Sequence, residues 1–248
     1  MGKTVAIIQA RMGSKRLPGK VLRPIIGKPM LAHLLDRLSY AKRIDLIVVA
    51  TSVGRADDPI ADLAENLDLT CFRGSEADVM DRVYQAALAY DADPIVRITA
   101  DCPLLDPTII DHVINEFFEN SADLALNSFR ETYPDGLDVE VFSLEALARC
   151  WQVAPEGPLR EHLYSYILKN PNQFEVHHVL HKENLKAHCW SVDDEVDFEF
   201  VEKVFTELHE DGRVFLMNDV LDLLERRPHL RAINASQIRN TWKAEVGL

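Results

Sequence analysis

Three absences narrow what this 248-residue chain can do. It has no apolar run of about 18 residues, so we expect no membrane-spanning helix. Its four cysteines are far apart and form no CxxC pair. This disfavours a disulfide framework or a zinc site, and predicts free thiols in a reducing cytoplasm. With a net charge of -13 and a pI near 5.1, the chain has little of the positive charge that binding along a nucleic acid requires.

Acidic residues are also absent from the first 35 positions, which carry seven Lys or Arg, since Asp36 is the first acid. Four of these cations follow the apolar run Val5–Ile8, a predicted strand, on a ten-residue loop: Arg11, Lys15, Arg16 and Lys20. The loop matches neither the Walker motif nor the dinucleotide fingerprint. Its glycines, Gly13 and Gly19, allow amide groups to approach an anion, and its cations are charge-assisted donors. The loop therefore predicts a site for a small polyphosphate, with a solvated basic turn as the alternative.

Strand-like apolar runs alternate with helical patterns through the first half of the chain. Strands are predicted at 5–9, 46–51 and 95–99, and helices at 29–41, from about 59, at 79–89 and from 107. This alternation predicts an α/β fold with a parallel sheet covered on both faces. Ligands of such sheets bind beyond the carboxyl ends of the strands. The loops after Gln9, Thr51 and Thr99 should therefore meet at one cleft.

The second half is less regular. Strands are predicted at 138–142, 174–180 and 188–192, and helices at 144–151, 160–168, 194–208 and 216–225. No linker or repeat is evident. The pattern predicts a single domain over residues 1–248, with a β-rich excursion at about 128–190.

Carboxylates follow two of the predicted strands. Asp101 comes just past the strand at 95–99, where it could hold Mg²⁺ against a polyphosphate or simply cap the next turn. Asp106, before Pro107, resembles a helix N-cap more plainly. In the pair Asp193 and Asp194, one residue should cap a helix and the other should be free to bind metal; spacing does not say which.

Three segments together resemble a known family: Ile8-Gln-Ala-Arg-Met-Gly-Ser-Lys-Arg-Leu-Pro-Gly-Lys20, Asp101-Cys-Pro-Leu104 and Val192-Asp193. They are similar to the cytidylyltransferases that activate acidic sugars. Most similar is the spore coat polysaccharide biosynthesis protein F group, related to CMP-KDO and CMP-acylneuraminate synthetases. The resemblance covers nearly the whole chain. It implies a three-layer α/β/α fold like that of nucleotide-diphospho-sugar transferases, with a mostly parallel sheet.

The resemblance also implies roles for individual residues. Arg11 and Lys20 would balance the leaving pyrophosphate, and Asp101 and Asp193 would hold Mg²⁺. The substrate-binding residues would be Ala10, Gly13, Ser14, Lys15 and Arg16 at the triphosphate, Gly74, Ser75, Asp78 and Arg82 near the base, and Asp138 and Glu140 near the sugar. Thr51, whose loop should meet the cleft, and Arg160, in a segment shared with the group, would also bind substrate.

Some of these assignments have plain structural alternatives. Asp78 and Arg82 are four residues apart and could form a surface helix pair. Asp138 and Glu140 share one face of a strand, which suits either hydroxyl recognition or an ordinary polar edge. His177 and His178 face opposite ways on a strand, which disfavours zinc.

The function predicted is that of a cytoplasmic, Mg²⁺-dependent cytidylyltransferase. It would transfer CMP from CTP to an acidic sugar and release pyrophosphate in surface polysaccharide biosynthesis, as a homodimer. No nucleic-acid or membrane partner is expected. The alternatives are a glycosyltransferase that uses a nucleotide-sugar donor, and a non-catalytic nucleotide-binding partner in polysaccharide assembly.

Overall fold

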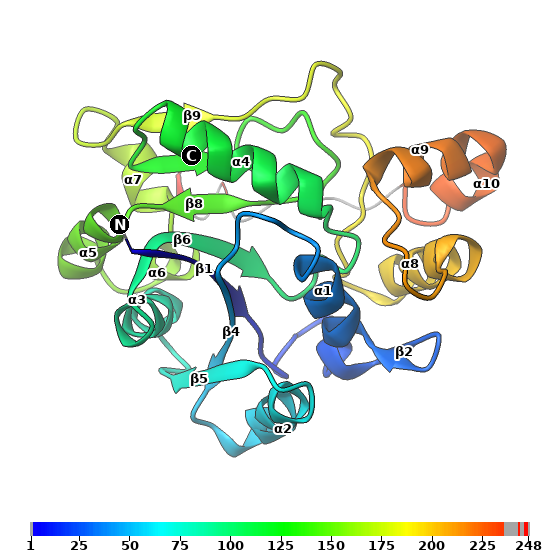
Figure 1. Cartoon of the computed structure of the whole chain (residues 1–248), viewed down its shortest axis with the longest axis horizontal. Helices are drawn as coiled ribbons and strands as arrows, with labels where there is room; N and C mark the ends of the chain where they lie inside the picture. The colour runs from blue at the N-terminus through cyan, green and yellow to red at the C-terminus, as the bar shows by residue number, and fades with distance from the viewer. Residues whose placement is uncertain (1, 236–242, 244–245, 248) are drawn as a thin grey trace.

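The computed structural model describes residues 2–235, 243, 246 and 247. Among them, seven strands form one sheet in the order β5-β4-β1-β6-β8-β7-β9 (Figure 1). The strands are β1 (Lys3–Gln9), β4 (Leu46–Ser52), β5 (Thr70–Gly74), β6 (Ala92–Thr99), β7 (Leu124–Leu126), β8 (Glu140–Phe142) and β9 (Val176–His178). Strand β8 is antiparallel to both of its neighbours, whereas the other neighbouring pairs are parallel. The predicted mostly parallel sheet is confirmed.

Helices cover both faces of the sheet because its central strands are apolar on both sides. In β1, Ala6 and Ile8 pack with α1 (Met30–Leu38), α2 (Asp58–Asn66) and α4 (Pro107–Glu119). The alternate residues Val5 and Ile7 pack with α3 (Val79–Ala89), α5 (Leu144–Val153) and α7 (Ser165–Lys169). All four of these β1 side chains are fully buried. Successive strand residues point to opposite faces, so one apolar run serves two cores and gives the three layers predicted.

The remaining elements lie around this core. They are η1 (Lys20–Leu22), β2 (Pro24–Ile25), β3 (Lys28–Pro29), η2 (Arg55–Asp57), α6 (Pro158–Glu161), α8 (Glu195–Leu208), α9 (Met217–Arg226) and α10 (Pro228–Arg231). Helices α8, α9 and α10 pack together beside the sheet (Figure 1). Phe205 of α8 packs on His33 of α1, with 4.4 Å between ring centroids.

The structure differs from the expected elements where the apolar pattern is weak. Strand β5 is a half-buried edge strand and β7 has three residues, so neither gave a strong apolar signal. The helix expected at 160–168 is divided into α6 and α7, because His162 has non-helical backbone angles. The strand expected at 188–192 was wrong: this segment makes one isolated bridge, between Cys189 and Asp135.

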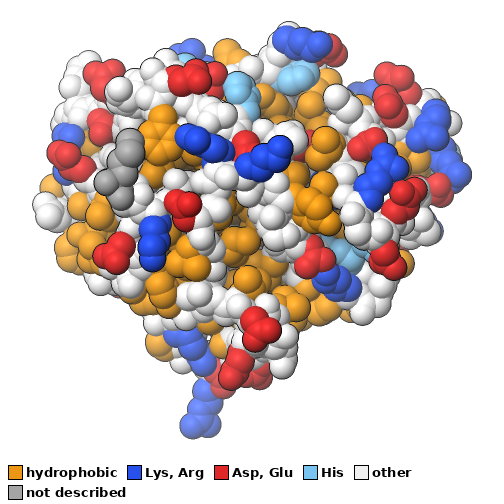
Figure 2. Space-filling model, in the orientation of Figure 1, with side chains coloured by type: hydrophobic (Ala, Val, Ile, Leu, Met, Phe, Trp, Pro, Cys, Tyr) orange, Lys and Arg blue, Asp and Glu red, His pale blue; other side chains and the backbone are white. Residues whose placement is uncertain are grey.

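Within residues 128–190, where a β-rich excursion is expected, the structure has β8, α5, α6, α7 and β9. The single domain and its excursion stay predictions. No helix among the described residues is both long enough and apolar enough to cross a membrane. On the face shown in Figure 2, acidic and basic side chains are interspersed.

Candidate active site

A polar cavity opens at the carboxyl ends of β1 and β6, where parallel sheets usually bind ligands. Its volume is about 690 Å³, within the range of small-molecule sites. Its lining comes from residues 9–21, 97–102, 128–140 and 157–164, together with Ala77, Ser191 and Asp193. The cavity therefore joins segments that are far apart in the sequence.

The basic loop is held in place by a carboxylate from the connection after β4. Asp57 of η2 accepts the amide N–H of Met12 at 2.7 Å and also accepts the hydroxyl of Ser52. The carbonyl of Met12 accepts the amide N–H groups of Ser14 and Gly19, each at 3.0 Å. Gly19 has φ 71°, a left-handed conformation that glycine adopts without strain. The loop after Thr51 thus supports the basic loop through Asp57, a residue that the sequence analysis missed.

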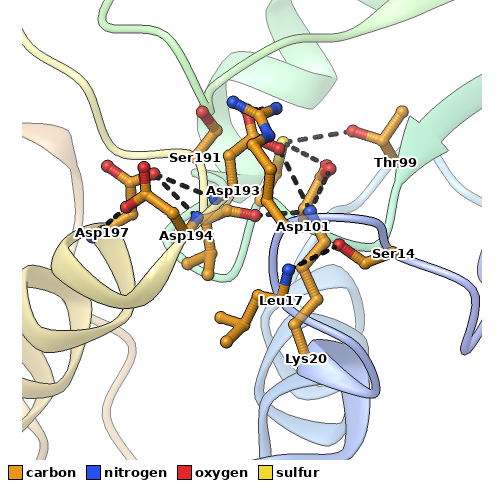
Figure 3. Close-up of polar contacts among 12 residues, drawn as sticks. Ser14, Leu17, Lys20, Thr99, Asp101, Ser191, Asp193, Asp194 and Asp197 are labelled. Carbon is orange, nitrogen blue, oxygen red and sulfur yellow. Dashed lines mark hydrogen bonds and ion pairs between the residues drawn. The ribbon is translucent and has the colours of Figure 1, made fainter. Parts of the chain in front are cut away.

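Lys20 connects the basic loop to the two aspartates expected to hold metal (Figure 3). Its Nζ lies 3.0 Å from Oδ2 of Asp101, 3.2 Å from Oδ1 of Asp193 and 2.6 Å from the carbonyl oxygen of Val192. Only 9% of the Lys20 side chain is exposed, against 29% for Asp101 and 25% for Asp193. One cationic group therefore lies between carboxylates that are 92 positions apart in the sequence.

Two further cations of the loop also meet acids of the cavity. Arg16 pairs with Oδ2 of Asp193 at 2.8 Å, and Arg11 pairs with Glu161 at 2.9 Å. Both arginine side chains are about half exposed, at 57% and 45%. Since exposed ion pairs contribute little to stability, these arginines can exchange partners for the oxygens of a bound phosphate.

The position of Asp193 is set by the start of α8. Asp194 caps this helix by accepting the amide N–H groups of Val196 and Asp197. The carboxylate of Asp197 in turn accepts the amide N–H groups of Asp193 and Asp194, at 3.0 and 3.2 Å. Asp194 is therefore the N-cap, which leaves the side chain of Asp193 directed at Lys20 (Figure 3).

The ion pairs also decide the charges of these groups. Burial by itself would raise the pKa of Asp101, but the Lys20 ammonium and a hydrogen bond from Thr99 outweigh it, so the pKa lies below its ordinary value. Burial would lower the pKa of Lys20, but the charges of Asp101 and Asp193 outweigh it and raise the pKa. Asp101 and Lys20 are therefore both charged at neutral pH.

The cavity also contains an arginine that the predicted site did not include. Arg97 of β6 donates to Oε1 of Glu140 at 2.7 Å and to Oε1 of Gln9 at 2.8 Å. The side chains of Arg97 and Glu140 are only 7% and 5% exposed. A cation within the apolar run Ile95–Ile98 was the available sequence signal, because a buried charge requires a partner.

Two more residues outside the predicted site, His162 and Tyr164, line the same cavity. Burial lowers the pKa of His162 to about 4, and burial raises the pKa of Tyr164 well above its ordinary value. Both side chains are therefore neutral at pH 7.

Ten of the predicted site residues line the cavity: Arg11, Gly13, Ser14, Lys15, Arg16, Lys20, Asp101, Asp138, Glu140 and Asp193. Seven lie behind or beside it instead: Ala10, Thr51, Gly74, Ser75, Asp78, Arg82 and Arg160. The roles of all seventeen stay predictions.

Several of the seven residues form a structural frame. Asp78 caps α3 and pairs with Nε of Arg160 at 2.7 Å, while Arg160 also donates to the carbonyls of Trp151 and Ala154. Arg82 is buried and donates to the carbonyl of Ser75. The expected alternative of a surface pair between Asp78 and Arg82 is therefore wrong.

Asp101 and Asp193 are the best candidates to hold a metal ion. Mg²⁺ usually takes one or two carboxylates and completes its shell with phosphate oxygens and water, so a two-carboxylate site fits it. The position of Lys20 shows that one cation can be shared by both side chains. Elsewhere in the described part of the chain, no group of three or more His, Cys, Asp or Glu is placed to hold a metal. His177, one of the histidines considered for zinc, pairs with Glu116.

A mostly parallel sheet with a cationic loop and a carboxylate at its strand ends, and a second carboxylate at a nearby helix start, is typical of α/β enzymes that act on the phosphates of a nucleotide. The chain belongs to the cytidylyltransferase family, whose model matches residues 5–224. It is therefore a nucleotidyltransferase, which removes the glycosyltransferase and the non-catalytic partner as alternatives.

Known proteins similar to the chain agree with this assignment. The spore coat polysaccharide biosynthesis protein SpsF of Bacillus subtilis is 32% identical over 92% of this chain and 96% of its own length. A 3-deoxy-manno-octulosonate cytidylyltransferase of Geobacter metallireducens is 37% identical over 45% of this chain and 43% of its own length. The solved structure of a cytidylyltransferase from Leptospira borgpetersenii superposes with a TM-score of 0.90 at 29% identity, over 97% of this chain and 100% of that one. The resemblance stated from the sequence is confirmed.

Proposed function

We propose that the chain transfers CMP from CTP to a hydroxyl group of a sugar and releases pyrophosphate, with Mg²⁺ held by Asp101 and Asp193. The observation that carries this proposal is the position of Lys20, which brings the basic loop against both carboxylates. The similar enzyme of Geobacter metallireducens, named for an octulosonate, supports a sugar as the acceptor.

In this reaction an oxygen of the acceptor forms a bond to the α-phosphorus. The bond from that phosphorus to the bridging oxygen breaks, pyrophosphate leaves, and the hydroxyl proton is lost to solvent. Catalysis then depends mainly on positioning and on neutralising charge. We infer that Arg11, Lys15 and Arg16, which line the cavity, bind the β- and γ-phosphates. Lys20 would bind phosphate oxygens that lie close to Asp101 and Asp193. When bound, Mg²⁺ would polarise the α-phosphate and lower the pKa of the acceptor hydroxyl.

The cytidine moiety is proposed to lie toward the segment between β5 and α3. Ala77 of this segment lines the cavity. Gly74, Ser75, Asp78 and Arg82 would then shape the base site, since Arg82 ties α3 to the carbonyl of Ser75. Thr51, Ala10 and Arg160 are proposed to support this site from behind.

The test is pyrophosphate release from CTP in the presence of Mg²⁺ and an acceptor. Asp101→Asn and Asp193→Asn should each reduce turnover at least 100-fold, about 2.7 kcal/mol in the barrier, because each removes a charge that holds the metal. The control is Asp62→Asn, at an exposed position of α2. Metal-dependent turnover that survives in both aspartate variants would contradict the metal assignment.

The finer points of the sequence prediction belong to the same proposal. An acidic sugar, a role in surface polysaccharide biosynthesis, a cytoplasmic location and a homodimer are all predictions from the resemblance. SpsF of Bacillus subtilis, named for spore coat polysaccharide biosynthesis, supports the pathway.

A further inference from the structure

The side chain of Asp57 is buried against the basic loop but does not line the cavity. It is only 4% exposed. In the described part of the chain, no Lys or Arg forms an ion pair with it. Its two oxygens accept the amide N–H of Met12 and the hydroxyl of Ser52. Asp57 is therefore bound to the backbone of the loop and to the end of β4, where a ligand in the cavity does not reach it.

The contact with Met12 fixes the residue on which the loop closes. The amide N–H of Met12 donates to Asp57 at 2.7 Å, and its carbonyl oxygen accepts the amide N–H groups of Ser14 and Gly19, each at 3.0 Å. Arg11 precedes this residue directly, and the other cations of the loop lie between Ser14 and the end of the closure. The orientation of Met12 therefore decides where the backbone presents these cations.

Asp57 is itself held by the ends of two strands. The hydroxyl of Ser52, at the end of β4, donates to Asp57 and accepts the amide N–H of Gly54 at 3.1 Å. Arg73 of β5 donates to the carbonyls of Ser52 and Gly54, each at 2.9 Å. The sheet thus fixes the segment that carries Asp57, and Asp57 connects the basic loop to it. A loop that is already held in one conformation loses less conformational entropy when a ligand binds.

The charge of a carboxylate has the wrong sign to attract a polyphosphate. The basic loop carries four cations, yet Asp57 is hydrogen-bonded to its backbone. Repulsion between this carboxylate and phosphate oxygens would weaken the binding of an anion. The two possible effects of Asp57 therefore have opposite signs. Its removal strengthens polyphosphate binding if its charge decides, and weakens binding if its hold on the loop decides.

We propose that Asp57 is a positioning residue for the triphosphate: by holding the amide N–H of Met12, it keeps the basic loop in the conformation that binds the β- and γ-phosphates. This inference rests on the proposed function, because it takes the basic loop as the triphosphate site. Asp57 contacts no substrate and acts through the backbone of the loop. Its removal weakens triphosphate binding even though a negative charge is removed with it.

The test measures the binding of three probes to the full chain by calorimetry, with Mg²⁺ in excess. CTP and tripolyphosphate carry the phosphates that the loop would bind, whereas CMP lacks the β- and γ-phosphates. Asp57→Ala should weaken the binding of CTP and of tripolyphosphate about tenfold, or about 1.4 kcal/mol, and should leave the binding of CMP nearly unchanged. Equal or tighter binding of CTP by the folded variant, or an equal loss for CMP, would overturn the proposal.

Two further variants separate the contact from the charge. Asp57→Asn removes the charge but keeps an oxygen that can accept the amide N–H of Met12, so it should bind CTP within about threefold of the wild type. Asp58→Ala removes the same charge one residue away. The side chain of Asp58 is 48% exposed and pairs with Arg73, so CTP affinity should not change. A loss in either variant as large as that in Asp57→Ala would contradict the role of the contact.

Melting temperatures show whether Asp57→Ala is folded. If it is not, Ser52→Ala takes its place: this variant removes only the hydroxyl that orients the carboxylate, and should weaken CTP and tripolyphosphate binding about threefold. Unchanged binding of both would then overturn the proposal.

The wild-type protein separates this inference from the proposed function. If the wild type binds tripolyphosphate but not CTP, the proposed donor is wrong, and tripolyphosphate alone decides the role of Asp57. If it binds neither, both ideas are wrong. CTP binding that persists unchanged in Asp57→Ala contradicts only the role of Asp57.

Discussion

At the scale of single residues, Lys20 balances two carboxylates that lie close together. Its ammonium group has three acceptors: the side chains of Asp101 and Asp193, and the carbonyl of Val192. A divalent cation bound by the two aspartates would compete for the same oxygens. Lys20 and the metal are therefore expected to exchange places when the nucleotide binds and offers Lys20 phosphate oxygens instead.

This exchange predicts the behaviour of Lys20→Met. The substitution leaves two partly buried carboxylates without their shared cation, and should lower the free energy of unfolding by about 2–3 kcal/mol. Mg²⁺ should restore part of this loss, because the ion can take the place of the ammonium group. Thermal unfolding with and without Mg²⁺ checks both effects. If Mg²⁺ raises the melting temperature of the variant no more than that of the wild type, the two cations do not share a position.

At the scale of elements, the cavity depends on how the turn before β8 meets the segment before α8. The amide N–H of Asp135 donates to the carbonyl of His188 at 3.0 Å, and the carbonyl of Asp135 accepts the amide N–H of Trp190 at 2.7 Å. Gly136 lies at the contact with φ 96°, and a Cβ atom there would be 2.4 Å from the amide nitrogen of Ser191. This approach holds Asp135 against Ser191, two residues before Asp193, and all three residues line the cavity.

Gly136→Ala should therefore lower the free energy of unfolding by more than the backbone strain of a left-handed residue would alone. We expect the free energy of unfolding to fall by about 3 kcal/mol, because backbone atoms on the other segment must also move. Gly212→Ala is the matched control: its φ is 76°, but no atom lies within 4 Å of an added Cβ. That variant should lose only about 1 kcal/mol. Urea denaturation of both proteins makes the comparison, and equal losses would mean that the close approach adds nothing.

Elements were predictable where the sequence pattern is local and strong. The continuous apolar run Val5–Ile8 is typical of a buried strand, and the apolar residues of α1 recur at helical spacing. Both elements were therefore expected. The strand β5 was not expected, since an edge strand buries too little to show an apolar run. The pairing of Arg160 with Asp78 was not expected either, because it joins two helices 82 positions apart.

At the scale of the whole molecule, the proposed nucleotide site exists only when the chain is folded. The basic loop, the end of β6 and the start of α8 meet around Lys20 (Figure 3). The protein has a net charge of -13, and this loop concentrates positive charge against that background. A ligand that joins these segments should therefore stabilise the native state as a whole.

CTP with Mg²⁺ should raise the melting temperature more than UTP, GTP or ATP does. At 100 times its dissociation constant, a ligand adds about 2.7 kcal/mol to the free energy of unfolding. For a chain of this length, that corresponds to a shift of about 5–10 °C. A thermal-shift series with the four triphosphates at equal concentration measures the order. A larger shift with another triphosphate would contradict the choice of CTP as the donor.

The sequence by itself determined the layered α/β fold and the basic loop after the first strand, because each depends on local pattern or on a motif. The pair Asp101 and Asp193 was predicted through the family resemblance, since spacing did not distinguish Asp193 from Asp194. Only the tertiary structure decided that Asp194 caps α8 and that Lys20 lies between the two aspartates. It also brought Arg97 and Glu140 together in the cavity. Such contacts join segments distant in the sequence, and an ion pair leaves no periodicity along the chain. The pairing of these charges was therefore hidden until the chain was folded.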